Sequence, residues 1–156
     1  MTKTESHKVA NFTLPITINP QRIADLLCGA IEGGSDYWLE GIEYILADGM
    51  ELADFRKGGK LAKQISDDYF HPTQIIPLFE GCGLRVETNG DWRNLAQQKE
   101  GKPRKPILNP QSIQTGLRIM AEKHKSHFGD FMSENDDAVT ADVFLQCCLF
   151  GELVFG

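Results

Sequence analysis

No uninterrupted apolar run in this sequence approaches the length of a membrane-spanning helix. Such a helix needs about 20 consecutive apolar residues, and charged or polar side chains interrupt every apolar stretch of the 156 residues well before that length. Residues 1–8 are polar and lack the apolar segment of a secretory leader. We therefore expect a protein of the cytoplasm that makes no contact with a membrane.

Cysteine is also scarce, and no C-x-x-C pair occurs among Cys28, Cys82, Cys147 and Cys148. Zinc sites use ligands paired at short spacing, and disulfide scaffolds carry more cysteine per residue. The adjacent Cys147 and Cys148 stand within an apolar stretch, which is typical of buried thiols. We expect four reduced cysteines, and neither a metal nor a cofactor.

Two common ligand-binding motifs are missing. The glycines and lysine of residues 58–60 do not form a phosphate loop, because G-x-x-x-x-G-K-[ST] would need glycine at Asp54 and Ser or Thr at Leu61. A calcium loop in the acidic stretch fails as well, since it places Asn135 where glycine is required and Ala141 where a bidentate Glu is required. Neither nucleoside triphosphates nor calcium are indicated by motif.

Basic charge is in short supply, and the charges are unevenly distributed. The formal net charge is −6. Residues 91–105 hold five basic and two acidic side chains, whereas residues 109–156 hold three basic and seven acidic ones. Tight binding to a phosphate backbone depends on Lys and Arg. We therefore expect no direct nucleic-acid binding, interpret the basic run at 99–105 as a solvated loop, and favour a basic partner.

Strand patterns occur in two places. Residues 12–18, F-T-L-P-I-T-I, alternate apolar and polar side chains with the period of a half-buried strand. Pro15 cannot donate to a strand ladder and favours an edge position. Residues 74–79 and 84–88, separated by a glycine-rich turn, predict a hairpin. Residues 37–46 fit either a helix or a strand.

Two helix starts share the phrase N-P-Q-x-I. Asn19 and Asn109 are good N-cap residues, and the proline that follows each is suited to the first helical position. The first helix should end at the glycine pair 33–34. We predict that the second helix covers residues 110–127 and ends at Gly129.

These elements predict an α+β fold. Dense apolar residues at 140–150 indicate a buried C-terminal helix. With 41% hydrophobic and 24% charged residues, the composition is that of a globular domain with a substantial core. We expect one compact domain at 9–156, in which three to four helices pack on a small antiparallel sheet with edge strands. Residues 1–8 should form a disordered tail and residues 89–106 an exposed loop.

The stretch S-E-N-D-D-A-V-T-A-D-V-F-L-Q, from Ser133 to Gln146, concentrates carboxylates before the C-terminal helix. Asp137 or Thr140 can cap free N–H groups there, and acids near a first turn meet the positive end of the helix dipole. The same acids can present a patch to a basic partner. A metal or catalytic site built from Asp136, Asp137 and Asp142, with His127, is a third interpretation.

A second candidate stretch is E-G-G-S-D-Y-W at residues 32–38. Two glycines allow close approach of the backbone, Ser35 and Asp36 offer hydrogen bonds, and Tyr37 and Trp38 can provide a stacking face. The alternative is a helix end followed by an aromatic anchor in the core.

These stretches carry a resemblance to a known group. I-A-D-L-L-C-G-A-I-E-G-G-S-D-Y-W and E-N-D-D-A-V-T-A-D-V-F-L-Q-C-C-L-F-G-E-L-V-F-G resemble small accessory proteins of tailed bacteriophages and prophages, and G-L-R-I-M-A-E-K-H-K-S-H-F-G-D shares the likeness. The resemblance covers about half of the chain and carries over no catalytic residue. It implies a non-structural protein in the cytoplasm of an infected bacterium. Such proteins often bind a host factor, and some neutralise a defence system or sequester its nucleotide signal.

Our leading hypothesis is a non-enzymatic binding protein that acts on a host protein or sequesters a small nucleotide-like ligand. A metal-dependent hydrolase using Asp136, Asp137 and Asp142 and an acidic nucleic-acid mimic are the alternatives, and a homo-oligomer is left open. The two candidate stretches would meet in one polar hollow if they form one site. The candidate binding residues are Gly33, Gly34, Ser35, Asp36, Tyr37, Trp38, Glu134, Asn135, Asp136, Asp137 and Asp142.

Overall fold

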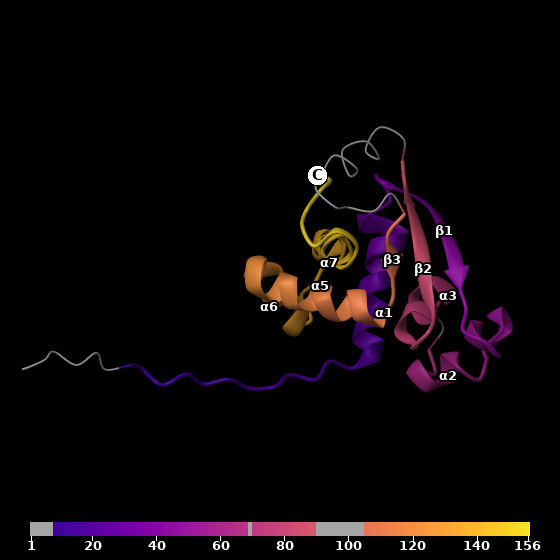
Figure 1. The fold of residues 1–156 in the computed structure, drawn as a ribbon, viewed down its shortest axis with the longest axis horizontal. Coiled ribbons are helices and arrows are strands. Elements are labelled where there is room, and N and C mark those ends of the chain that lie inside the picture. Colours follow the sequence, from indigo (N-terminus) through magenta and orange to yellow (C-terminus); the bar gives the residue numbers. More distant parts are fainter. Residues whose placement is uncertain (1–7, 69, 90–104) are drawn as a thin grey trace, which may run out of the picture.

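The computed structural model describes residues 8–68, 70–89 and 105–156. Most of the tail predicted at 1–8 and of the loop predicted at 89–106 therefore lies outside the described residues. The described part forms a small antiparallel sheet with helices packed beside it (Figure 1), which confirms the α+β prediction. None of the helices among the described residues is long and apolar enough to cross a membrane.

The sheet has three strands in the order β1-β2-β3. β1 pairs antiparallel with β2 from Leu39 opposite Thr88 to Ile45 opposite Gly83, and β2 pairs antiparallel with β3. The register shifts between Leu39 and Gly41, as in a β-bulge. The strands are β1 (Leu39–Ile45), β2 (Gly83–Thr88) and β3 (Ile107–Leu108).

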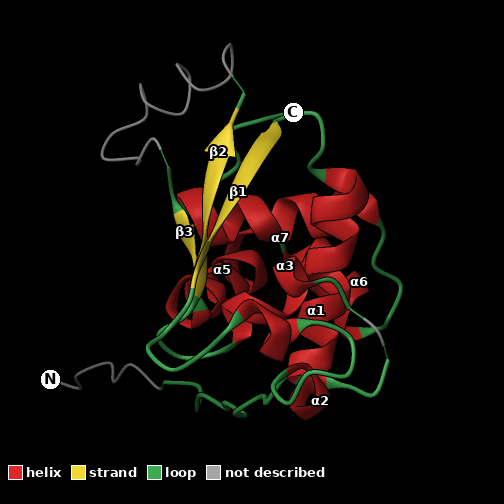
Figure 2. Ribbon diagram, turned by 90° about the vertical axis from the view of Figure 1, so that its right-hand side faces the viewer, coloured by secondary structure: helices red, strands yellow, loops and turns green. Residues whose placement is uncertain are grey.

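The helices outnumber those predicted, because several short helical turns lie in the connection between β1 and β2 (Figure 2). They are α1 (Pro20–Gly29), the π-helical turn η1 (Ala30–Gly34), η2 (Leu52–Phe55), α2 (Ala62–Ile65), α3 (Pro72–Ile75), η3 (Ile76–Leu78), α5 (Pro110–Lys123), α6 (Lys125–Met132) and α7 (Ala138–Phe150).

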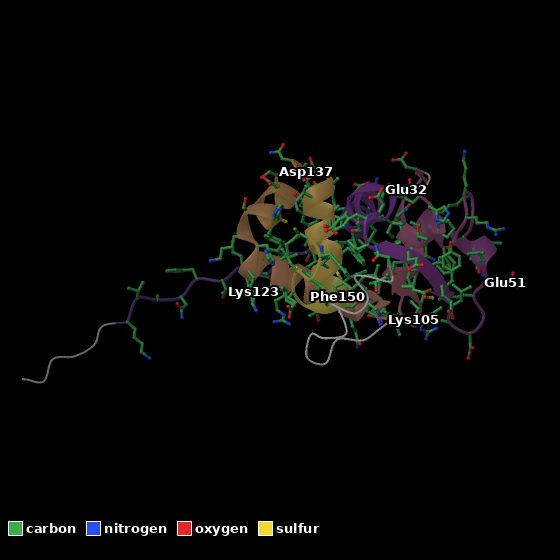
Figure 3. The ribbon with its side chains drawn as sticks, turned by 90° about the horizontal axis from the view of Figure 1, so that it is seen from above. Glu32, Glu51, Lys105, Lys123, Asp137 and Phe150 are labelled. Atoms are coloured by element: carbon green, nitrogen blue, oxygen red, sulfur yellow. The ribbon has the colours of Figure 1, made fainter. Side chains whose placement is uncertain are left out.

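The centre of the core is α7, which runs between the labelled Asp137 and Phe150 (Figure 3). Its residues from Thr140 to Phe150 are all buried, and it packs against α1, η1, α5 and α6. The helices α5 and α7 approach closely at Gly116, where a Cβ would collide with the side chain and backbone of Cys148. A helix that is apolar on every side must be enclosed by others, which confirms the buried C-terminal helix.

The repeated N-P-Q-x-I phrase starts two helices, as predicted. The Asn19 Oδ1 accepts a hydrogen bond from the Gln21 N–H at 2.9 Å, and Pro20 opens α1. The Asn109 Oδ1 accepts from the Ser112 N–H at 2.9 Å, and α5 follows. Each cap satisfies a backbone donor that the helix itself leaves without a partner.

Two predictions are wrong, one about the type of an element and one about the length of a helix. Residues 74–79, predicted as the first half of a hairpin, are mostly helical in α3 and η3, because His71 caps the turn and Pro72 starts it. The second half, 84–88, is correct and forms part of β2, which pairs with β1 instead. The helix predicted over 110–127 breaks at His124, whose φ of −131° and ψ of 57° are not helical.

The strand predicted at 12–18 has no strand partner in the described chain. These residues form an extended segment that leaves the body next to the start of α1 and runs away from the sheet (Figure 1). Phe12, Leu14 and Ile16 are exposed by 90%, 86% and 59%. The alternation is thus present without the sheet that would bury one face of it.

Candidate functional site

The two candidate stretches meet at Asp142, a buried carboxylate on α7. Its Oδ1 accepts hydrogen bonds from the Ser35 hydroxyl and the Trp38 Nε1–H, both at 2.8 Å. Its Oδ2 accepts from the Tyr37 hydroxyl at 2.8 Å and from the Gln146 amide at 3.1 Å. Four donors match the lone pairs of one ionised carboxylate. Segments 107 residues apart are joined by this single side chain.

The backbone of η1 makes this meeting geometrically possible. Gly34 lies so close to α7 that a Cβ at this position would collide with the carbonyl oxygen of Ala138. At Gly33, by contrast, a Cβ would meet nothing within 4 Å. The packing of η1 against α7 therefore requires glycine at position 34 but not at position 33. The close approach carries Ser35 over the side of α7 where Asp142 lies.

The same network fixes the C-terminal segment. The side-chain amide oxygen of Gln146, Oε1, accepts hydrogen bonds from the backbone N–H groups of Val154 and Phe155 at 2.8 and 2.9 Å. The Phe155 ring stacks on the Trp38 indole at 4.9 Å between ring centroids and 10° between planes. Phe150 contacts both rings edge-on. Gln146 is thus held in one orientation, with its amide directed at the carboxylate on α7.

Tyr37 completes the outer side of the network. Burial raises the pKa of its phenol, and the hydrogen bond to Asp142 raises the pKa further. The phenol therefore stays protonated and keeps donating to the carboxylate, while 41% of the residue remains exposed. Trp38 is fully buried. Its ring does not offer the stacking face that the sequence suggested.

The other acids of the cluster have structural partners of their own, and Glu134 shares the partner of Asp136, because its carboxylate lies 3.9 Å from the Arg22 guanidinium. The Asp136 carboxylate pairs with Arg22 at 3.0 Å, and the same guanidinium donates to the Phe131 carbonyl at 2.6 Å. The Asp137 Oδ1 accepts the Thr140 N–H at 2.9 Å and caps α7, which confirms the capping interpretation. That hydrogen bond lowers the pKa of the Asp137 carboxyl.

These contacts bear on the alternatives. Asp136, Asp137 and Asp142 are directed to three different partners, and His127 contacts the Thr140 hydroxyl at 3.1 Å. Nowhere in the described ranges do three or more His, Cys, Asp or Glu side chains form a group that could hold a metal ion. The hydrolase alternative needs these carboxylates to converge, and they do not. A phosphate-like row also needs exposed acids, whereas Asp142 is 8% exposed.

The predicted segments therefore converge at a buried contact. Ser35, Trp38 and Asp142 are buried and fill the meeting point themselves. Outside this network, the candidates Gly33, Asp36, Glu134 and Asn135 lie nearer the surface or on it, whereas Tyr37 belongs to the network and is partly exposed. The role of these outer residues in binding stays a prediction, while the shared network has a structural role.

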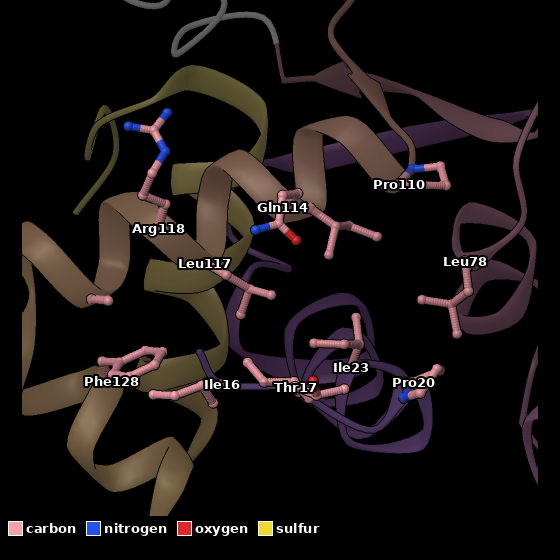
Figure 4. A pocket seen from close by; sticks show the side chains of 13 residues that line it. Ile16, Thr17, Pro20, Ile23, Leu78, Pro110, Gln114, Leu117, Arg118 and Phe128 are labelled. Atoms are coloured by element: carbon pink, nitrogen blue, oxygen red, sulfur yellow. The ribbon is translucent and has the colours of Figure 1, made fainter. Parts of the chain in front are cut away.

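A groove that no sequence pattern predicted lies on another face (Figure 4). Its volume is about 490 Å³. Only Gln114 and Arg118 contribute long polar side chains, and Arg118 points away from the hollow (Figure 4). The lining residues are Ile16, Thr17, Ile18, Pro20, Ile23, Leu78, Pro110, Ile113, Gln114, Leu117, Arg118, Ala121 and Phe128.

The groove joins α5 and α6, which are neighbours in the sequence, with α1 and η3, which come much earlier in the chain. Ile23 comes from α1, Leu117 from α5 and Phe128 from α6, while Leu78 comes from η3 next to the sheet. The helical path breaks at His124, between α5 and α6, and Phe128 then lines the groove. A stripe of apolar residues on a helix normally indicates core, so nothing in the sequence marked this side of α5 as a groove.

Comparisons of the chain with protein-family models, with curated proteins and with solved structures found no match.

Proposed function

We propose that this protein is a non-enzymatic binding protein whose contact surface is the apolar groove between α1, α5 and α6. The observation that carries the proposal is the lining itself. Ile23, Leu117 and Phe128 face one open hollow from three helices. Binding pockets are mostly apolar, with a few polar groups that set orientation, and here Gln114 supplies such a group.

A protein segment fits this groove better than a nucleotide-like ligand does. Phosphate groups are bound by helix N-termini, clustered backbone N–H groups or several basic side chains. Among the described lining residues Arg118 is the only cation, and its side chain points away from the hollow. An extended or helical segment that presents two or three apolar side chains matches the lining chemistry.

The resemblance to phage accessory proteins suggests where such a segment comes from. A protein acting in an infected bacterium would bind a host protein, and we propose a host factor as the partner. The acidic surface before α7, with Glu134 and Asp137, would then favour a partner that carries basic residues beside its apolar segment.

The test is capture from host lysate with the groove altered at one position. Leu117→Asp introduces a charge into the apolar lining, whereas Thr115→Asp introduces the same charge at an exposed position of the same helix outside the lining. We expect a partner that the wild type and Thr115→Asp retain and Leu117→Asp loses, with thermal unfolding showing that Leu117→Asp is folded. Equal capture by all three proteins would contradict the groove as the contact surface.

Isothermal titration against cyclic and linear nucleotides separates the ligand classes. We expect no heat of binding with any nucleotide. Stoichiometric binding of a nucleotide that Leu117→Asp abolishes would show that the groove takes a small ligand instead of a protein segment.

A further inference from the structure

We propose that the groove is occupied by the N-terminal arm of a second copy of this chain, so that two copies exchange arms. The arm is defined as residues 9–15. Its apolar side chains Phe12 and Leu14 stand on alternate positions and are 90% and 86% exposed. This proposal rests on the groove of the proposed function. The exchanged arm and a host segment cannot fill one groove at the same time, so a host segment would have to displace the arm.

The chemistry of the arm matches that of the groove. Residues 9–18, V-A-N-F-T-L-P-I-T-I, contain no charged side chain. The groove lining contains one cation, Arg118, which points away from the hollow. Exposing several large apolar side chains on one segment is costly in water and marks a contact surface. An uncharged apolar segment and an uncharged apolar groove on one chain are complementary.

The arm is also continuous with the groove. Ile16, Thr17 and Ile18 form one wall of it, and the chain on the N-terminal side of this wall runs outward, away from the sheet (Figure 1). The part beyond Ile16 spans roughly 23–25 Å if seven residues are extended. A neighbouring copy related by a two-fold axis can therefore bind this arm in its groove while its own arm binds in the first groove. Each contact of the exchange is then made twice in the dimer.

Pro15 favours exchange over a β-sheet pairing. Proline lacks the N–H that a strand ladder needs, and it holds Leu14 in an extended conformation. The arm is therefore suited to lie extended in a groove and to contribute side chains rather than backbone hydrogen bonds. The alternation of apolar and polar residues, which predicted a buried strand, is equally the pattern of a segment with one apolar face.

Sedimentation of the full chain over a wide concentration range is the first test. We expect a monomer–dimer equilibrium. Phe12→Asp and Leu14→Asp should each weaken self-association roughly 100- to 10,000-fold, the range that corresponds to losing the burial of one large apolar side chain in each of the two exchanged contacts. Thr13→Asp adds the same charge on the opposite face of the arm and should have much less effect. These side chains are exposed, so the substitutions leave the fold intact. A monomer at every concentration would overturn the proposal, as would a dimer indifferent to Phe12 and Leu14.

Mixing experiments identify the groove as the receiving surface. Phe12→Asp has an intact groove, and Leu117→Asp has an intact arm. We expect each to associate weakly alone and their mixture to recover one of the two exchanged contacts. Failure of the mixture to associate more strongly than either protein, when both are folded, would overturn the assignment of the groove.

Introduced cysteines show which chain donates the arm. Leu14→Cys and Gln114→Cys, mixed under mild oxidation, should give a disulfide-linked dimer that wild type does not form under the same conditions. If the cross-link forms only within a doubly substituted chain, the groove holds the arm of its own chain and the exchange is refuted.

The exchange and the host-directed function can fail separately. Dimerisation without any captured host partner would support the exchange and refute only the host-directed function. A host partner captured by a chain that stays monomeric at every concentration would refute only the exchange.

Discussion

Removing the Asp142 carboxylate should be among the most destabilising single changes in this protein. Asp142→Ala leaves two donors that are fully buried, the Ser35 hydroxyl and the Trp38 Nε1–H, without their acceptor. Each buried donor left without a partner costs about 1–3 kcal/mol, so the loss should be roughly 2–6 kcal/mol. Tyr37 is partly exposed and can turn to water. Domains of this size are stable by only about 5–15 kcal/mol.

Asp142→Asn separates the charge from the shape. The substituted side chain keeps one oxygen, which can still accept from Ser35 and Trp38, but its N–H₂ group replaces the oxygen that accepts from Gln146. Gln146 cannot reverse its own amide, because its carbonyl oxygen holds two backbone N–H groups of the C-terminal segment. Two N–H₂ groups would then face each other, and we expect a loss of about 1–3 kcal/mol.

Urea unfolding followed by far-ultraviolet circular dichroism measures these losses. Asp36→Ala, an exposed acid in the same turn, is the matched control and should change stability by less than about 0.5 kcal/mol. Ser35→Ala should destabilise the wild type but have little effect in the Asp142→Ala background, where it removes a donor that already lacks its acceptor. The network would be refuted as a source of stability by an Asp142→Ala loss under about 1 kcal/mol, or by equal costs of Ser35→Ala in both backgrounds.

Three further predictions concern packing and titration. Gly34→Ala should destabilise by roughly 1–3 kcal/mol, because its Cβ would collide with an α7 carbonyl, whereas Gly33→Ala should be neutral or slightly stabilising in thermal unfolding. Folding raises the pKa of Tyr37, so the stabilisation that the Tyr37 phenol contributes is complete below the ordinary tyrosine pKa and is lost as the pH rises through the pKa of the folded protein. Tyr37→Phe should therefore make the unfolding free energy fall less steeply at alkaline pH. Burial raises the pKa of Cys147 to about 11 and raises that of Cys148 well above its ordinary value, so iodoacetamide should label both far more slowly than it labels urea-unfolded protein; labelling at equal rates would contradict their burial.

The Asp142 network contributes to the stability of the fold, whereas the groove is the proposed binding surface. The network ties η1, α7 and the C-terminal segment together through one carboxylate and one amide, Asp142 and Gln146. Most of its members are buried, so changes there should act on folding and reach binding only indirectly. A change at Phe12 on the arm should act on association with a much smaller effect on folding. Leu117 in the groove also packs against the core, so a change there should act on both.

Local elements followed from local chemistry. Asn19 and Asn109 each place an acceptor beside a proline that suits a helix start, so both helices could be predicted from a few neighbouring residues. Asp137 also places an acceptor at a helix start, although no proline follows it. The density of apolar residues after Thr140 required a buried helix, because no single face of that helix could meet water without exposing them.

Tertiary structure decided what those elements do. The sequence alone determined that residues 12–18 alternate, but only the position of the sheet relative to the helices left this segment without a strand partner. The sequence also shows that residue 142 is acidic and residue 38 aromatic. Only the close approach of the backbone at Gly34 to α7 makes the Asp142 carboxylate the buried acceptor of the Trp38 N–H. Whether Asp142 is buried, and which side chains contact it, depends on residues about a hundred positions away in the sequence. A local sequence pattern cannot predict such contacts. The groove exists for the same reason, since three helices had to pack before their apolar stripes could leave a hollow between them.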